Sequence, residues 1–114
     1  MEVSKADWKL FRERIPEWQE RHMARLNREY VALLNGEGAA SEKFWALEKR
    51  VSADKRSPGV LISLKRSEMI WDIRELLDEG VISTKDLDGF SEELKEVIAS
   101  YRGITFAKFD FSED

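Results

Sequence analysis

The sequence predicts an all-α fold: a bundle of four to five helices around a central helix over residues 58–79, followed by an extended aromatic C-terminal tail. Hydrophobic residues make up 42% of the chain and charged residues 37%, a balance typical of amphipathic helices. Apolar residues recur at spacings of three and four, and residues that begin or end helices flank these stretches. A length of 114 residues suits one domain. We therefore expect a single helical domain over 1–103 and a tail over 104–114.

The N-terminal helix is expected from about Lys5 to about Leu34. Ser4, followed three residues later by Asp7, resembles a capping box with Asp in place of Glu. An apolar stripe stays in phase along the whole segment and contains Trp8, Phe11, Ile15, Trp18, Leu26, Tyr30 and Leu33. Pro16 lies inside this stripe and removes one backbone hydrogen bond. We expect a short helix, a bend near residues 14–16 and then a long helix; one kinked helix is the alternative.

A second helix is expected after the loop 36–41, which is rich in glycine and small residues. Ser41 is expected to cap this helix, which then runs from Glu42 to about Lys55. Its inner stripe contains Phe44, Leu47 and Val51, with Trp45 off to one side.

The central helix is predicted from signals at both ends of the stretch between Ser57 and Gly80. Ser57 is a good N-cap, Pro58 suits the first helical position, and Gly80 can end a helix in the left-handed conformation. At about 100° per residue the apolar side chains fall on two opposite sides. One side has Val60, Leu64 and Trp71, and the other has Ile62, Met69, Ile73 and Leu76. A helix with two apolar sides needs neighbours on both, so we expect this helix to be the inner one.

The segment after Gly80 is expected to hold a short helical turn and a last helix. Ser83 precedes the turn, which ends by Leu87, and Ser91 caps a helix from Glu92 to about Arg102. The tail has β-prone and aromatic residues at Ile104, Phe106, Phe109 and Phe111. Solvent-exposed phenylalanine side chains promote association, so we expect part of the tail to dock on its own domain or on another chain.

Residues 73–98 resemble a short C-terminal oligomerisation hairpin of bacterial proteins. The shared pattern is a leucine-bearing helix, a glycine, two apolar residues, a hydroxyl residue and an acidic–leucine pair. The matching residues are Leu76, Leu77, Gly80, Ile82, Ser83, Asp86 and Leu87. The chain departs from the pattern at Asp88–Gly89, which interrupt the second helix. The whole sequence is also similar to small helical proteins of Gram-positive bacteria. The first resemblance implies self-association, and neither implies a catalytic activity.

The sequence contains few residues that could form a catalytic or metal-binding site. The chain has no cysteine, which excludes disulfides, zinc–thiolate sites and thiol nucleophiles. His22 is the single histidine and falls within the Trp18–Leu26 stripe, where a hydrogen-bonded contact between helices is the expected role. Gln19 stands where a di-iron Glu-x-x-His motif needs Glu, and no phosphate loop or catalytic triad is evident. We expect no enzyme activity, no metal and no cofactor.

The charge is unevenly distributed along the chain, which has a formal net charge of −4. Residues 43–66 carry seven basic and two acidic side chains, a net charge of +5, whereas residues 67–114 carry a net charge of −8. Basic and acidic parts are expected to face each other within the fold or across a dimer. The alternative is nucleic-acid binding through the basic segment 43–66.

The favoured function is protein–protein interaction by a small cytoplasmic helical module of bacterial type, with a homodimer as the expected assembly. The first residues lack the apolar core of a signal peptide, so we expect none, and we expect no membrane span. The candidate interaction residues are Lys49, Arg50, Lys55, Arg56, Lys65, Arg66, Phe106, Phe109 and Phe111. A third possibility is an enzyme or ligand carrier with a cavity near His22 and the tryptophans.

Overall fold

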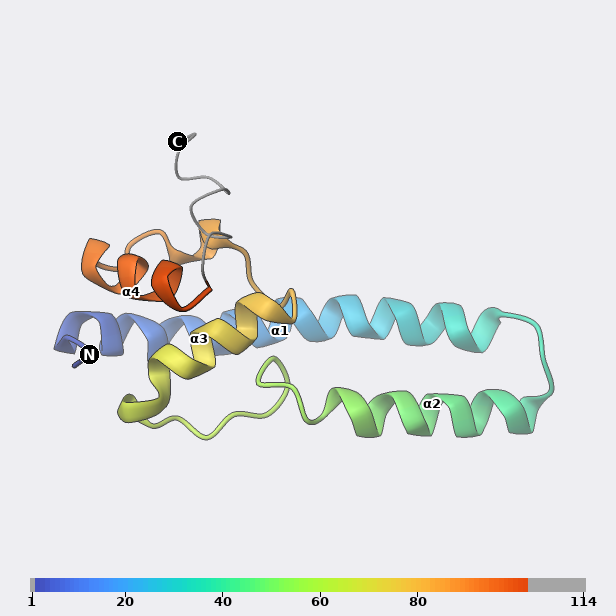
Figure 1. Cartoon of the computed structure of the whole chain (residues 1–114). Coiled ribbons are helices and arrows are strands. Elements are labelled where there is room, and N and C mark those ends of the chain that lie inside the picture. Colours follow the sequence, from blue (N-terminus) through green and yellow to red (C-terminus); the bar gives the residue numbers. More distant parts are fainter. Residues whose placement is uncertain (1, 103–114) are drawn as a thin grey trace.

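The computed structural model describes residues 2–102 and confirms the all-α prediction for that part of the chain (Figure 1). It contains four α-helices and two short 3₁₀-helices, with no strand between residues 2 and 102. In chain order these are α1 (Lys5–Asn35), α2 (Ala40–Asp54), η1 (Arg66–Glu68), α3 (Met69–Asp78), η2 (Thr84–Leu87) and α4 (Glu92–Arg102). The predicted aromatic tail over 104–114 lies outside the described residues.

Helix α1 is the element on which the other helices pack. It begins at the predicted cap, where Ser4 Oγ accepts a hydrogen bond of 3.1 Å from the backbone N–H of Asp7. It then continues through Pro16 as one helix of 31 residues, so the expected division into a short and a long helix near residues 14–16 was wrong. Proline inside a helix costs about 3 kcal/mol. Pro16 itself is exposed, whereas Ile15 and Trp18 on either side are buried, and their packing offsets that cost.

The N-terminal half of α1 and the C-terminal helices together form a compact part that we call the head: residues 5–22 with α3, η2 and α4 (Figure 1). Aromatic rings of α1 run through its centre: Phe11 lies edge-on to Trp18 at 6.2 Å, and Trp18 lies 6.3 Å from Phe90. The largest fully buried side chains are Trp18, Phe11, Met69, Ile73, Leu76, Leu87, Leu94, Ile98 and Val81. The head therefore holds the main apolar core of the described chain.

The predicted central helix over 58–79 was wrong, because only its later part, Met69–Asp78, is α-helical. Ser57 does not cap a helix; its hydroxyl accepts a 3.0 Å hydrogen bond from Gly59 N–H and closes a tight turn. Residues 61–65 then run without helical structure to η1, and α3 begins only at Met69. Gln19 Nε2 donates to Pro58 O at 3.0 Å, and the guanidinium of Arg66 donates to the carbonyl of Val3. These contacts hold the segment alongside α1, so α1 takes the organising place expected of residues 58–79.

Helix α2 and the C-terminal half of α1 form a two-helix hairpin that extends away from the head (Figure 1). We call residues 23–35 of α1 together with α2 the arm. The two helices are antiparallel and are joined by the short loop after Gly36, close to the predicted helix end at Asn35–Gly36. The arm gives the molecule its elongated shape, with principal extents of 52 × 30 × 20 Å.

Most of the predicted helix ends are confirmed, and the start of α2 was displaced, as was that of the central helix. Helix α2 begins at Ala40 rather than after Ser41, since Glu42 Oε1 accepts a 3.0 Å hydrogen bond from Ala39 N–H. Ser91 Oγ caps α4 by accepting from Leu94 N–H at 3.1 Å, as predicted. Gly80 follows α3 with a φ of 75°, the left-handed conformation that glycine adopts at low cost. No helix in residues 2–102 is long and apolar enough to cross a membrane.

Candidate interaction surface on the helical arm

Helix α2 is the least buried α-helix of the described chain, because none of its residues is fully buried. It packs against α1 through half-buried residues on one side, which are Lys43, Leu47, Arg50, Val51 and Asp54. The remaining side faces solvent. An amphipathic helix normally buries its apolar stripe completely in the domain to which it belongs. The solvent-facing side of α2 is therefore the candidate surface for contact with another molecule.

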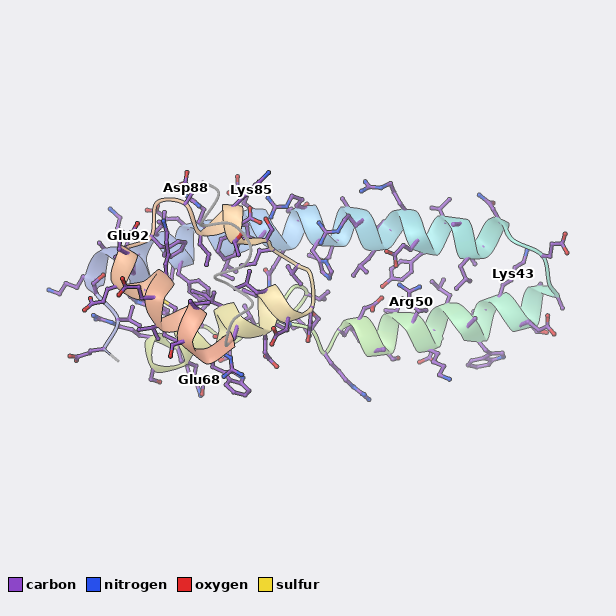
Figure 2. The ribbon with its side chains drawn as sticks, turned by 45° about the horizontal axis from the view of Figure 1, so that its top comes forward. Lys43, Arg50, Glu68, Lys85, Asp88 and Glu92 are labelled. Atoms are coloured by element: carbon purple, nitrogen blue, oxygen red, sulfur yellow. The ribbon has the colours of Figure 1, made fainter. Side chains whose placement is uncertain are left out.

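Polar interactions hold α2 on α1 near the middle of the arm. Tyr30 Oη donates a 2.5 Å hydrogen bond to Asp54 Oδ2, and Arg50 Nη2 lies 2.7 Å from Glu29 Oε1. The Arg50 guanidinium also lies 3.6 Å from Asp54 Oδ2 and covers the Tyr30 ring at 5.4 Å from its centroid. Burial, together with the hydrogen bond to Asp54, raises the pKa of Tyr30 to about 12. The phenol thus remains a hydrogen-bond donor at physiological pH. Figure 2 shows Arg50 between the two helices of the arm.

Exposed apolar side chains gather at the outer end of the arm. Phe44 is 61% exposed and Trp45 63% exposed, and their rings meet edge to face at 4.9 Å. Val31 and Leu34, in the last turns of α1, are also exposed. The hairpin connection brings the start of α2 beside the end of α1 (Figure 1). Two exposed aromatic rings in contact with each other are typical of a protein-binding surface.

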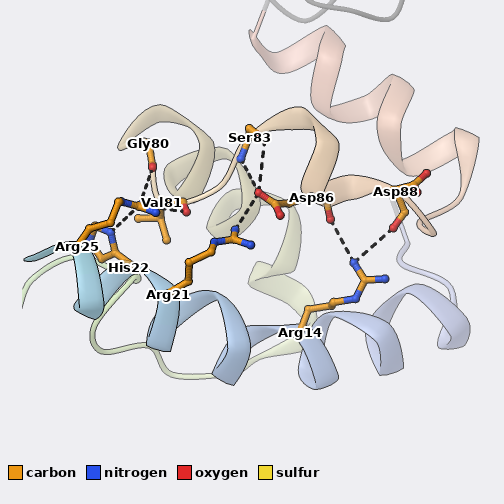
Figure 3. Close-up of polar contacts among 9 residues, drawn as sticks. All are labelled: Arg14, Arg21, His22, Arg25, Gly80, Val81, Ser83, Asp86 and Asp88. Atoms are coloured by element: carbon orange, nitrogen blue, oxygen red, sulfur yellow. Dashed lines mark hydrogen bonds and ion pairs between the residues drawn. The ribbon is translucent and has the colours of Figure 1, made fainter. Parts of the chain in front are cut away.

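A polar cluster fixes the base of the arm to the head (Figure 3). Arg25 Nη2 donates to Gly80 O at 3.0 Å and to Val81 O at 3.4 Å, which satisfies carbonyls just beyond the end of α3. The same nitrogen lies 3.0 Å from His22 Nδ1. Since arginine has only donors, Nδ1 accepts and the ring proton lies on Nε2. His22 is therefore hydrogen-bonded, as expected, but its partner lies in the same helix and not in another one. Burial together with the adjacent Arg25 charge lowers its pKa.

Two further arginines of α1 bind the connection between α3 and α4. Arg21 Nη2 lies 2.9 Å from Asp86 Oδ2, and Arg14 Nη1 donates to Asp86 O at 3.3 Å and to Asp88 O at 3.4 Å (Figure 3). The same Asp86 carboxylate accepts from Ser83 N–H at 2.8 Å, the second half of the predicted cap. The segment that resembles an oligomerisation hairpin is thus docked on its own α1, with Ile82 and Leu87 buried in the head.

The candidate basic residues do not form one surface. Arg50 is bound to the acidic groups of the arm, and Arg66 is bound to the carbonyl of Val3 at the other end of the molecule. Lys49, Lys55, Arg56 and Lys65 are exposed. The non-helical path after Ser57 separates Lys65 from the basic residues of α2 (Figure 1). The other three candidates, Phe106, Phe109 and Phe111, lie outside the described residues.

A second exposed apolar group lies on the head. Trp71 is 54% exposed on α3, and the Arg74 guanidinium stacks on its ring at 4.7 Å from the centroid. Leu61 and Leu64 are exposed in the segment that precedes η1. This group lacks the aromatic pair and the protruding shape of the arm. Trp71, which was expected on one apolar side of an inner helix, is thus largely exposed.

Asp72 is a buried carboxylate in α3 with an unsatisfied oxygen. Its side chain is 7% exposed, and Oδ2 has no hydrogen-bond partner. Burial raises its pKa to about 6, and the charges of Glu68 and Glu75 add to that effect. No group of three His, Asp or Glu side chains within residues 2–102 is arranged to hold a metal ion.

Comparison with known proteins adds no relative from which a role could be transferred: no protein-family model, no curated protein and no solved structure matches this chain. The sequence analysis placed Phe44 in an inner stripe, but Phe44 is exposed. Polar and small residues stand at helical spacing from Trp45, and this pattern indicates a side of α2 that does not pack on α1. Function therefore has to be argued from the arm itself.

Proposed function

We propose that this protein is a non-catalytic interaction module that self-associates through its helical arm. The observation that carries the proposal is the exposed aromatic pair Phe44–Trp45 on a helix that buries none of its residues completely. Aromatic side chains supply much of the binding energy at protein interfaces, because a large rigid area is removed from water at a small entropic cost.

Burial of this surface against a partner would be energetically favourable. Removing apolar area from water is worth about 25 cal/mol per Å², so leaving two large rings in water forgoes roughly 2–5 kcal/mol that a partner would recover. The contacts that position α2 on α1 are mainly polar and include three partly exposed ion-pair groups. Such pairs contribute only about 0–1 kcal/mol each. A partner that covers the outer side of α2 would stabilise the arm as well as itself.

The proposal excludes the hairpin after Gly80 as the means of self-association. Its apolar residues Val81, Ile82 and Leu87 are buried within the head, and Asp86 is bound by Arg21. Opening that segment would expose core residues. The arm offers its apolar surface without any rearrangement.

Light scattering after size-exclusion chromatography tests the proposal directly. From about 5 to about 500 micromolar, a range that covers weak protein association, we expect the mass to rise towards twice the monomer value of 13.3 kDa. Trp45→Ser should keep the protein monomeric over this range. Trp71→Ser is the matched control, because it removes an equally exposed tryptophan from the head. A wild-type protein that stays monomeric throughout, or a Trp45→Ser protein that associates like the wild type, would contradict the proposal.

A further inference from the structure

The solvent-facing side of α2 carries a stripe of five residues at successive spacings of three, four, four and three. In order they are Glu42, Trp45, Lys49, Ala53 and Arg56. All five are exposed, whereas the residues between them that face α1 are half-buried. Arg56 lies just beyond α2, in a turn where its N–H still donates to Ala53 O at 3.1 Å. We call these five residues the outer stripe.

We propose that two copies of the chain pair their outer stripes in antiparallel orientation about a two-fold axis at Lys49. The inference rests on the proposed function and names its partner and its register. With the axis at Lys49, residue numbers of facing positions add to the same total. Glu42 then faces Arg56 of the second copy, and Trp45 faces Ala53 of the second copy. Both pairs occur twice, because a two-fold interface is self-complementary.

Charge complementarity selects this orientation. The stripe begins with an acid at Glu42 and ends with a base at Arg56, so reversal of one helix joins opposite charges at both ends of the interface. A parallel pair would place each residue against its own copy: Glu42 against Glu42 and Arg56 against Arg56. Like charges at facing positions destabilise helix pairs, and both ends of the parallel arrangement would meet this cost.

Size complementarity points to the same register. Trp45 is the largest residue of the stripe and Ala53 the smallest, and Ser52 lies beside Ala53 with its hydroxyl bonded to Glu48 Oε2 at 2.9 Å. A large side chain opposite a small one lets two helices approach to the usual 8–10 Å, as a packed interface requires. Phe44, which meets the Trp45 ring edge to face, would cover one flank of this contact.

Lys49 is the position at which the register brings like charges together. Its long side chain can leave the axis and keep its ammonium group in water. The short length of α2, 15 residues, also limits the buried area to the lower range of stable interfaces. We therefore expect a reversible dimer with a dissociation constant on the order of 10 micromolar, which Lys49→Gln should tighten.

Cysteine cross-linking tests the register, because the natural chain has no cysteine. Lys49→Cys places two thiols at the axis, and mild oxidation should convert most of the protein to a covalent dimer. Glu42→Cys is the matched control on the same exposed stripe. Its two thiols would be separated by about 21 Å along the helices, since seven residues on each side of the axis rise about 1.5 Å each. A mixture of Glu42→Cys with Arg56→Cys should form a disulfide-linked heterodimer, although neither cross-links alone.

The possible results distinguish a failure of the antiparallel register from a failure of self-association itself. Cross-linking of Glu42→Cys alone as readily as Lys49→Cys would overturn the antiparallel register. A wild-type protein that dimerises in light scattering while Lys49→Cys fails to cross-link would overturn the use of this stripe and leave self-association standing. A wild-type protein that remains monomeric would overturn both. Circular dichroism of each variant, compared with the wild type, checks that the helices stay intact, above all for Glu42→Cys, because Glu42 Oε1 also accepts from Ala39 N–H at the start of α2.

Discussion

The carboxylate of Asp7 binds Ser91 twice, although 84 residues separate them in sequence. Oδ1 accepts a 3.0 Å hydrogen bond from the Ser91 N–H, and Oδ2 accepts one of 2.6 Å from the Ser91 hydroxyl. Each residue also belongs to a helix cap: Asp7 N–H donates to Ser4 Oγ, and Ser91 Oγ accepts from Leu94 N–H. One buried contact thus joins the first turn of α1 to the first turn of α4.

Removing this contact should destabilise the head. We expect Asp7→Ala to lower the free energy of unfolding by about 2–4 kcal/mol, because two partly buried donors of Ser91 lose a charged acceptor. Ser91→Ala should cost about 1–3 kcal/mol, which includes the lost cap. The double variant should cost less than the sum of the two, by about 1–2 kcal/mol. Urea denaturation measures all three values.

Ser100→Ala is the control for that cycle, since Ser100 is an exposed residue of the same helix. Its effect should stay within about 0.5 kcal/mol and add to that of Asp7→Ala. Strict additivity between Asp7→Ala and Ser91→Ala would show that the contact does not couple the two helices.

Gly59 should tolerate no side chain, because the turn approaches α1 and the end of α3 closely. A Cβ at this position would lie 2.6 Å from His22 Cδ2 and 2.7 Å from Val81 Cγ2. We expect Gly59→Ala to cost about 1–3 kcal/mol through the shifts that it forces on packed neighbours. Gly36→Ala is the control, because its nearest atoms would be 3.5 Å away and its φ is −76°. Equal midpoints for the two variants in thermal unfolding would argue against the close approach.

Asp72 should make the protein less stable at neutral pH than in mild acid. Its folded pKa of about 6 lies above the unfolded value of 3.8, so the folded state disfavours the charged form. The resulting cost is complete above about pH 6 and disappears as the pH falls towards 3.8. Asp72→Asn should therefore gain about 1–2 kcal/mol at neutral pH and nothing below about pH 4.

Urea unfolding across this pH range checks the prediction, with Asp88→Asn as an exposed control in the same part of the fold. The control should change stability by less than about 0.5 kcal/mol at every pH. A constant gain for Asp72→Asn from acid to neutral pH would mean that the gain does not come from titration.

His22 should have the opposite effect on the pH dependence. Burial and the charge of Arg25 lower its folded pKa below 6.5, so the folded state favours the neutral ring. Above pH 6.5 both states are neutral and stability is unaffected; below it the unfolded state binds a proton first, and stability falls. His22→Gln should remove this loss. The comparison is best made with Asp72→Asn in both proteins, because the two groups titrate in overlapping ranges. If His22→Gln lost stability in acid as much as the protein with His22, protonation of His22 would not be the cause of that loss.

Helix ends could be predicted because the interactions that make them are local. Ser4 and Ser91 each bond to a backbone N–H three residues further on, and Gly80 adopts its left-handed conformation whatever surrounds it. The placement of Asp7 could not be foreseen in this way. Its partner lies at the other end of the chain, and the local pattern described it only as part of a cap.

The prediction of a central helix failed because its start depends on contacts with residues that are distant in the sequence. Ser57–Pro58 begins a helix in many proteins, but the same pair also suits a turn in which Ser57 Oγ accepts from Gly59 N–H. The choice between the two depends on Gln19 and His22 of α1, which contact the turn. Periodicity also predicted that Phe44 would be inside, because it reports which residues share a side of a helix and not whether another helix covers that side.

A charge-reversal cycle between Glu42 and Arg56 tests the self-association of the arm most directly. Each single change, Glu42→Arg or Arg56→Glu, places like charges at both ends of the antiparallel interface. Sedimentation equilibrium should then show a dissociation constant about threefold to tenfold weaker than that of the wild type at low salt. The double variant restores opposite charges at both ends, and its dissociation constant should return to within about twofold of the wild-type value. A double variant weakened by the sum of the two single effects, or single variants that bind like the wild type, would contradict the account.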